Sequence, residues 1–294
     1  MTNADIRRQY DEVIAPFYDQ DPQGVFDSTG RRVITQLQQA ATREDPELPF
    51  NVLDLGMGTG AFCERLRRSL PFDMQPFGLD ISAQMLEVAR RRLPDLICEI
   101  DDAASVASHF SDTTFDLVCT HFVTGFVPLA QLAPTIFDRM RPGGLFSFAG
   151  GTSQGYPELA RLASSRLVRT LFGGRSAQLD DLLTPVDEQD VARTLRQCGF
   201  EVLSNELFAP RLVFRDFEDF MAFAWKGGWL TPFIEQIGLQ KAGRMTRALL
   251  DAVVFPVTDE HRIAITLARK PADPMVVESV RSSRSEAAAP LPRV

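Results

Sequence analysis

The chain has 294 residues, of which 45% are hydrophobic and 24% are charged, and its formal net charge is −8. This length suffices for one large or two small domains. The acidic balance and the lack of a long basic run argue against a nucleic-acid partner, and no apolar run reaches the roughly 18–20 residues of a membrane span. The N-terminus lacks the apolar segment of a secretory signal, and the four cysteines have no C-x-x-C spacing. We therefore expect a cytoplasmic protein with a small-molecule partner, no metal and no membrane contact.

Apolar residues at helical spacing over 3–18, behind a candidate N-cap at Asn3, predict an amphipathic helix. A loop is expected over 19–30 and a second helix over 31–41. From residue 50 onward, short apolar strands alternate with helical segments, a pattern typical of a parallel sheet covered by helices. The predicted strands cover 50–55, 75–80, 96–100, 115–121, 144–149, 200–208 and 262–269, and the predicted helices cover 60–69, 82–92, 129–140 and 187–198.

Two stretches, 150–185 and 209–258, interrupt this alternation. The first contains a helical piece over 157–171. The second has an apolar, aromatic helical face behind Asp216, followed by Thr231 as a candidate cap. We expect a single domain over 1–274, with a helical N-terminal lid over 1–48, a cofactor-binding core over 50–150 and two lid insertions over 151–185 and 209–258. A disordered tail is expected over 275–294.

The most informative segment is the strand that ends in a loop with glycines at alternate positions, Gly56, Gly58 and Gly60. Glycine lets the backbone bend tightly and approach a ligand with no Cβ in the way. A helix that begins at about Thr59 would point its N–H groups at the same crevice. Because ligands of such folds lie beyond the carboxyl ends of the strands, this loop predicts a binding site.

Acidic side chains follow the same edge of the predicted sheet. Asp54 precedes the glycine loop, Asp80 ends the second strand, and Asp102 follows the third. Asp80 lies near the offset of roughly 20 residues at which an acid accepts hydrogen bonds from ribose hydroxyls. Since the loop has no Lys or Arg, it would repel a pyrophosphate but not a cationic nucleoside.

Five motifs follow one another along the chain: Asp54-Leu55-Gly56-Met57-Gly58-Thr59-Gly60, Gly78-Leu79-Asp80-Ile81-Ser82 with Met85, Asp102-Ala103, Phe115-Asp116-Leu117-Val118 and Arg141-Pro142-Gly143-Gly144. In this order and at these spacings they resemble class I S-adenosylmethionine-dependent methyltransferases, in particular small-molecule enzymes of the ubiquinone and menaquinone type. The resemblance covers about residues 50–205 and the last strand. It implies an α/β, Rossmann-like, doubly wound sheet of seven strands with the last strand antiparallel and with helical lid insertions.

The resemblance implies S-adenosylmethionine as the cofactor. The glycines would cradle its methionine moiety, Asp54 would reach its amino group, and Asp80 would bind the ribose. Ile81 and Met85 would sandwich the adenine, with Asp102 at its exocyclic amine, and Tyr18 resembles a tyrosine that such enzymes place over the cofactor. The residues expected at the cofactor are Tyr18, Asp54, Gly56, Met57, Gly58, Gly60, Asp80, Ile81, Met85, Asp102, Ala103 and Thr120.

The expected reaction is O-, N- or C-methylation of a small, largely apolar or aromatic acceptor by a biosynthetic tailoring enzyme. His121, at the end of the strand 115–121, is either a general base or a hydrogen-bonded structural residue. Gly125-Phe126 stands where many relatives carry a histidine pair, so a mechanism that uses that pair does not transfer. His109 and His261 are expected at the surface or at an edge. The expected acceptor contacts are Phe122, Phe126, Trp225 and Trp229.

Two alternatives stay open at this point. The first is an NAD(P)-dependent oxidoreductase, because glycine-rich strand-to-helix turns also bind dinucleotides. The second is a methyltransferase-like protein that binds the cofactor without catalysis.

Overall fold

The computed structural model describes residues 2–42, 48–166 and 184–273. Seven of its strands form one sheet in the order β3-β2-β1-β4-β5-β9-β6, and β9 runs antiparallel to both of its neighbours. The predicted seven-stranded, Rossmann-like α/β sheet with its last strand antiparallel is confirmed. The strands are β1 (Phe50–Leu55), β2 (Met74–Asp80), β3 (Ile97–Ile100), β4 (Phe115–His121), β5 (Met140–Gly151), β6 (Glu201–Phe208) and β9 (Ile263–Arg269).

Helices cover both faces of the sheet because adjacent strand residues point to opposite sides. Val52 packs into the apolar cluster that contains Leu66, whereas Leu53 packs into the cluster that contains Phe137. The strand order reverses between β1 and β4, which places a crevice at their carboxyl ends. One face carries α2 (Val25–Ala40), α3 (Ala61–Ser69) and α4 (Ala83–Arg92), and the other carries α5 (Leu129–Arg139) and α8 (Glu188–Gln197).

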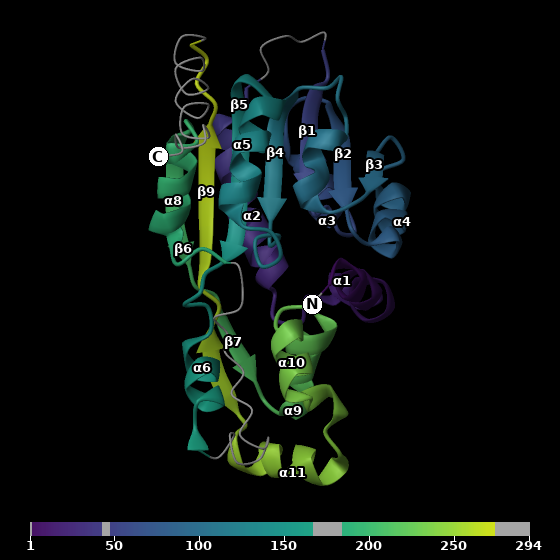
Figure 1. The fold of residues 1–294 in the computed structure, drawn as a ribbon, viewed down its shortest axis with the longest axis vertical. Helices are drawn as coiled ribbons and strands as arrows, with labels where there is room; N and C mark the ends of the chain where they lie inside the picture. The colour runs from purple at the N-terminus through teal and green to yellow at the C-terminus, as the bar shows by residue number, and fades with distance from the viewer. Residues whose placement is uncertain (1, 43–47, 167–183, 274–294) are drawn as a thin grey trace, which may run out of the picture.

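A lid lies beyond the carboxyl ends of the parallel strands, in the lower half of Figure 1. Its centre is an antiparallel pair, β7 (Arg211–Phe214) and β8 (Val257–Glu260), which the sequence did not predict. These strands have four residues each and are far apart in the chain, so no local periodicity reveals them. The helices of the lid are α6 (Pro157–Ala163), α9 (Phe217–Met221), α10 (Thr231–Ile237) and α11 (Arg244–Val253). The helical piece predicted over 157–171 lies in part, and the predicted tail 275–294 wholly, outside the described residues.

Two predicted helix starts in the lid have different outcomes. Asp216 caps α9 as expected, since its side chain accepts from the Asp219 N–H at 2.8 Å. The prediction that Thr231 caps the next helix is wrong, because Leu230 is the N-cap and the buried Thr231 hydroxyl has no hydrogen-bond partner among the described residues. The aromatic face behind Asp216 is also not one regular helix, since a π-helical turn over Ala222–Lys226 follows α9.

The N-terminal segment lies just beyond the strand ends, above α10 in Figure 1. The helix predicted over 3–18 is shorter: α1 (Asn3–Gln9) passes into a π-helical turn over Tyr10–Ile14. The N-cap is Thr2 rather than Asn3, because Thr2 and Asp5 form a reciprocal capping box. The turn packs against the lid, where a Cβ on Gly228 would come within 2.9 Å of Ile14.

The loop predicted over 19–30 is also wrong in its second half, since α2 begins at Val25. Its first N–H groups are bound by Asp21, whose carboxylate accepts from the N–H groups of Val25 at 2.8 Å and of Asp27 at 2.9 Å. The acid therefore caps the helix from four residues away rather than from the N-cap position. No helix in the described part of the chain is long and apolar enough to cross a membrane.

Candidate active site

The glycine loop after β1 has a left-handed backbone at all three glycines, with φ of +73° at Gly56, +56° at Gly58 and +73° at Gly60. A Cβ on Gly56 would lie 2.4 Å from Cγ2 of Val123, so this position has neither the conformation nor the space for a side chain. Gly60 is the N-cap, and α3 begins at Ala61, within two residues of the predicted start. Gly56 and Gly58 line the pockets at this crevice.

Asp80 connects this loop to the end of β2. One oxygen of its carboxylate accepts from the N–H of Gly58 at 2.7 Å, and the other accepts from the N–H of Ser82 at 2.8 Å. Burial raises the pKa of Asp80 to about 6, although the two hydrogen bonds oppose this rise. For Asp54, burial first and the nearby Asp80 second raise the pKa to about 8. Two adjacent buried carboxyl groups at this edge would thus gain from a cationic ligand.

A pocket beside Asp80 contains most of the residues that the sequence predicts at an adenosine. On the core side it is lined by Gly56, Gly58, Leu79, Asp80, Ile81, Met85, Asp102 and Ala103, and on the N-terminal side by Ile6, Tyr10 and Tyr18. Gly60 does not line it. This residue is at the start of α3, where a Cβ would lie 3.1 Å from the Cβ of Ala89. Thr120 is fully buried, and its hydroxyl has no partner among the described residues.

Three polar contacts attach the N-terminal segment to the rim of this pocket. The amide of Asn3 donates to Asp102 at 2.8 Å, and the hydroxyl of Ser82 donates to Asp11 at 2.5 Å. Arg92 forms an ion pair with Asp19. Residues 3–19 are therefore bonded to the core beside the nucleoside pocket, which Ile6, Tyr10 and Tyr18 line.

Tyr18 lies at the junction of the cavities. A Cβ on Gly58 would touch its ring at 3.3 Å, and the ring packs against Phe26 with a centroid distance of 4.7 Å. Burial raises the pKa of Tyr18 well above its ordinary value, so the phenol is protonated at neutral pH. It lines the nucleoside pocket and two further pockets, as does Phe122.

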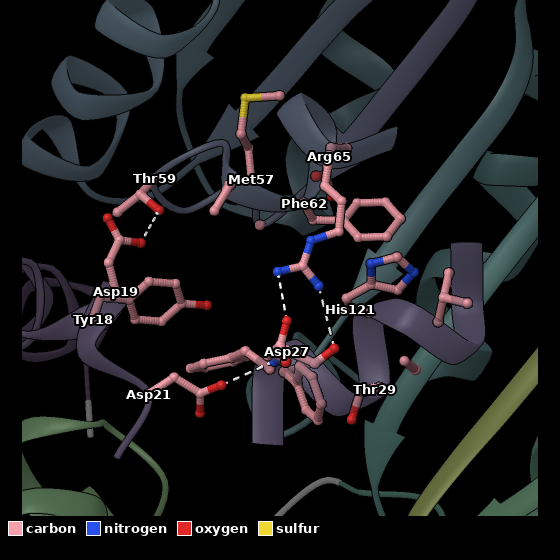
Figure 2. A pocket seen from close by; sticks show the side chains of 18 residues that line it. Tyr18, Asp19, Asp21, Asp27, Thr29, Met57, Thr59, Phe62, Arg65 and His121 are labelled. Carbon is pink, nitrogen blue, oxygen red and sulfur yellow. Dashed lines mark hydrogen bonds and ion pairs between the residues drawn. The ribbon is translucent and has the colours of Figure 1, made fainter. Parts of the chain in front are cut away.

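The second pocket extends from the glycine loop toward α2 and α3. Figure 2 shows Tyr18, Arg65 and His121 around its space. One Arg65 guanidinium nitrogen lies 2.8 Å from the Asp27 carboxylate, and another donates to the Asp27 carbonyl at 3.2 Å. Neither residue was predicted at the site, because the glycine loop itself has no Lys or Arg and a loop was expected at residue 27. Met57 and Asp54 also line this pocket.

His121 is held at the end of β4. Its Nε2 lies 3.1 Å from the Ser147 hydroxyl, and its ring meets Phe62 edge to face with a centroid distance of 4.4 Å. Burial lowers the pKa of His121 to about 3, so the imidazole is neutral at physiological pH. The next residue, Phe122, has a left-handed φ of +59°, a costly conformation for a bulky residue that is found mainly at functional sites.

The third pocket lies between the sheet and the lid and is mainly aromatic. Its walls include Tyr10, Phe26, Phe122, Phe126, Tyr156 and Trp229. Trp225, which was predicted beside them, does not line this pocket and packs against the apolar cluster that contains Phe223. His261 also lines this pocket and is only 3% exposed, so the expected surface or edge position is wrong. Only its place in sequence, directly between two strands, could have indicated a buried position.

Comparison with known proteins agrees with this geometry. The profile of a family described as "Methyltransferase domain" matches residues 52–144. Carboxy-S-adenosyl-L-methionine synthase of Trichodesmium erythraeum is 24% identical over 186 residues, which are 58% of this chain and 72% of that protein. Trans-aconitate 2-methyltransferase of Methylobacterium radiotolerans is 35% identical over 102 residues, which are 34% of this chain and 38% of that protein.

A solved structure from Bacillus halodurans C-125, assigned as a methyltransferase, has the same fold. Its TM-score is 0.54 at 17% identity, and the match covers 82% of this chain and 99% of that chain. Residues 52–144 carry a class I S-adenosylmethionine-dependent methyltransferase domain. The match spans 72% of the length of the synthase but only 38% of the length of the trans-aconitate enzyme.

The residues of the methyltransferase domain fit S-adenosylmethionine. Asp54 and Asp80 supply buried carboxylates, and a Cβ on Gly58 or Gly56 would enter space that Tyr18 or Val123 borders. No group of three potential metal ligands occurs within the described ranges. The donor set is that of a site for an organic cation.

These pKa values give a prediction for cofactor binding. Because the free protein holds Asp80 and Asp54 at pKa values of about 6 and 8, a cationic ligand must displace protons to bind the carboxylates. Because both pKa values are raised in the folded state, the contribution of these groups to the stability of the free protein is full below about pH 4 and is lost as the pH rises through 6 and 8. The same rise in pH deprotonates both groups and so strengthens the binding of a cationic ligand. Affinity for S-adenosylhomocysteine, whose amino group is cationic, should rise about tenfold from pH 6 to pH 7. Calorimetry in two buffers of different ionisation enthalpy measures the affinity and the protons released, and a pH-independent affinity would contradict the assignment.

Proposed function

We propose that this protein transfers a methyl group from S-adenosylmethionine to a small, largely apolar or aromatic acceptor held between the sheet and the lid. The observation that carries the proposal is the junction at Tyr18 and Phe122, where the carboxylate-lined nucleoside pocket meets the aromatic pocket. A nucleoside on one side and an acceptor on the other would face each other across these two rings. O-, N- or C-methylation in a biosynthetic pathway fits this arrangement.

In this proposal the predicted cofactor residues other than Gly60 and Thr120 keep their roles. Gly56 and Gly58 would approach the methionine moiety with Asp54 at its amino group, and Asp80 would accept from the ribose. Ile81 and Met85 would contact the adenine, with Asp102 and Ala103 at its edge. Arg65, which points into the pocket beside the glycine loop, is the described cation best placed for the carboxylate of the methionine moiety.

S-adenosylmethionine supplies an electrophilic methyl group on a sulfonium. The chain contributes orientation and the exclusion of water, and positioning of this kind is worth on the order of 7–11 kcal/mol. Phe122, Phe126 and Trp229 would orient the acceptor. His121 is neutral and bonded to Ser147, which favours a hydrogen-bonding role, and its role as a general base stays a prediction.

Binding and methyl transfer are tested separately. Calorimetry with S-adenosylhomocysteine and with NAD should show binding of the first alone, whereas binding of NAD alone would favour the oxidoreductase alternative. A panel of phenols, catechols, amines and quinols, incubated with methyl-labelled S-adenosylmethionine, should yield a labelled product from at least one class. Cofactor binding with no transfer to any of them would favour a non-catalytic protein.

A further inference from the structure

His261 is fixed by the backbone that connects the lid to the sheet. It lies between β8 and β9, and its backbone N–H donates to the carbonyl of Pro210 at 3.1 Å. The neighbouring Arg262 carbonyl accepts from the N–H of Thr152 at 2.9 Å, which brings the end of β5 alongside. The imidazole therefore has a defined place where β5, β8 and β9 meet.

Aromatic rings and one glycine determine the position of this imidazole. Tyr156 stacks on it with a centroid distance of 4.6 Å, and Trp229 meets it edge to face at 4.9 Å. A Cβ on Gly151 would lie 2.9 Å from Nε2, so the glycine leaves space beside that nitrogen. A ring held in this way presents its polar atoms in a reproducible direction.

Two buried polar atoms at this place have no partner among the described residues. His261 Nδ1 and Thr152 Oγ1 are both buried without a hydrogen bond to any described residue, and both residues line the pocket. Buried polar atoms are usually paired, and each one left unpaired is costly. The tautomer of a histidine is normally set by the bond at its other nitrogen. Because Nδ1 of His261 has no hydrogen bond to a described residue, neither tautomer is fixed, and the ring can offer either an N–H or a lone pair to a ligand.

None of the described residues that line the pocket is Lys, Arg, Asp or Glu. A carboxylate or ammonium group in this space would lose its hydration without gaining an ion pair with any of these residues, and that loss is severe. The lining thus favours a neutral ligand with a flat apolar body and one hydrogen-bonding substituent.

We propose that the acceptor is a neutral, planar aromatic molecule and that His261, together with Thr152, binds a hydroxyl or carbonyl oxygen on it. The inference rests on the proposed function, since it describes the acceptor side of the same site. It assigns His261 and Thr152 to acceptor recognition, in contrast to Tyr18 and Asp80 on the cofactor side.

Three probes of one shape test this proposal: 1-naphthol, naphthalene and 1-naphthoate. Trp229 lines the pocket, and in a Trp225→Phe background it is the one tryptophan left to report binding by fluorescence quenching. With S-adenosylhomocysteine present, 1-naphthol should bind at least tenfold more tightly than either of the other probes. His261→Phe should bring naphthol to the affinity of naphthalene, and Thr152→Val should reduce the preference in part.

The controls separate this inference from the proposed function. Thr35→Val removes an exposed hydroxyl on α2 and should leave every affinity unchanged. Calorimetry with S-adenosylhomocysteine should give the parental affinity in all variants, which also shows that each has folded. Failure of the parent protein to bind S-adenosylhomocysteine overturns the proposed function. Normal cofactor binding with no naphthol binding, with equal affinity for naphthol and naphthalene, with tighter naphthoate binding, or with a preference that survives both His261→Phe and Thr152→Val, overturns the acceptor assignment alone.

Discussion

Asp80→Ala should weaken binding of S-adenosylhomocysteine at least a hundredfold while leaving the protein folded. An ionised Asp80 would accept from the ribose hydroxyls, and hydrogen bonds to a charged group contribute about 1.5–3 kcal/mol each. The substitution also removes the acceptor of the Gly58 N–H, so the glycine loop loses one of its fixed points. Isothermal calorimetry at pH 7.5 measures the change.

The fold should survive because two effects of Asp80→Ala oppose each other. The N–H groups of Gly58 and Ser82 lose a partner, which destabilises the protein, but a buried carboxyl group whose ionisation is disfavoured is also removed. Asp112→Ala is the matched control, because it removes the same charge from an exposed turn before β4. Asp80→Ala with an affinity within threefold of the parent protein would remove Asp80 from the cofactor site.

Gly56→Ala should have a second large effect, on both stability and binding. The left-handed φ of +73° costs an L-residue about 1–2 kcal/mol, and the new Cβ would lie 2.4 Å from Val123. The loop must move to relieve this contact, so binding of S-adenosylhomocysteine should fall more than a hundredfold. Urea unfolding and calorimetry measure the two effects.

Gly24 offers a matched control for this substitution. Its φ is +67°, but nothing lies within 4 Å of a Cβ placed there. Gly24→Ala should therefore show the conformational cost alone and bind S-adenosylhomocysteine normally. The double variant Gly56→Ala/Val123→Ala should regain the part of the stability that the clash removes. Equal losses of stability for Gly24→Ala and Gly56→Ala, with normal binding in both, would show that the backbone of the loop does not need to approach the ligand.

The core of the fold could be predicted from the sequence because its signals are local. Most strands of the sheet contain a short apolar run, and the glycine loop and Asp80 belong to motifs read within a few residues. Asp54, Asp80 and Asp102 do lie at one sheet edge, as the order of the strands requires. The cofactor side of the site follows from these signals.

The acceptor side could not be predicted, because it depends on contacts between distant segments. The pairing of β7 with β8 and the burial of His261 arise only when the two ends of the lid meet. The two π-helical turns near Ile14 and Trp225 pack against each other, and the spacing of their apolar residues is compatible with an ordinary helix. The helix that carries Asp27 was not predicted, because Asp21 caps α2 from outside the usual N-cap position.

The contacts of Asn3, Asp11 and Asp19 with the core have a consequence for turnover. They hold the N-terminal segment beside the adenosine pocket, so we expect a spent nucleoside to leave more readily once this segment has detached. Where this departure limits turnover, the steady-state rate should be independent of which acceptor was methylated. Since each contact includes a carboxylate and one is an ion pair, we expect added salt to hasten departure and to raise the steady-state rate.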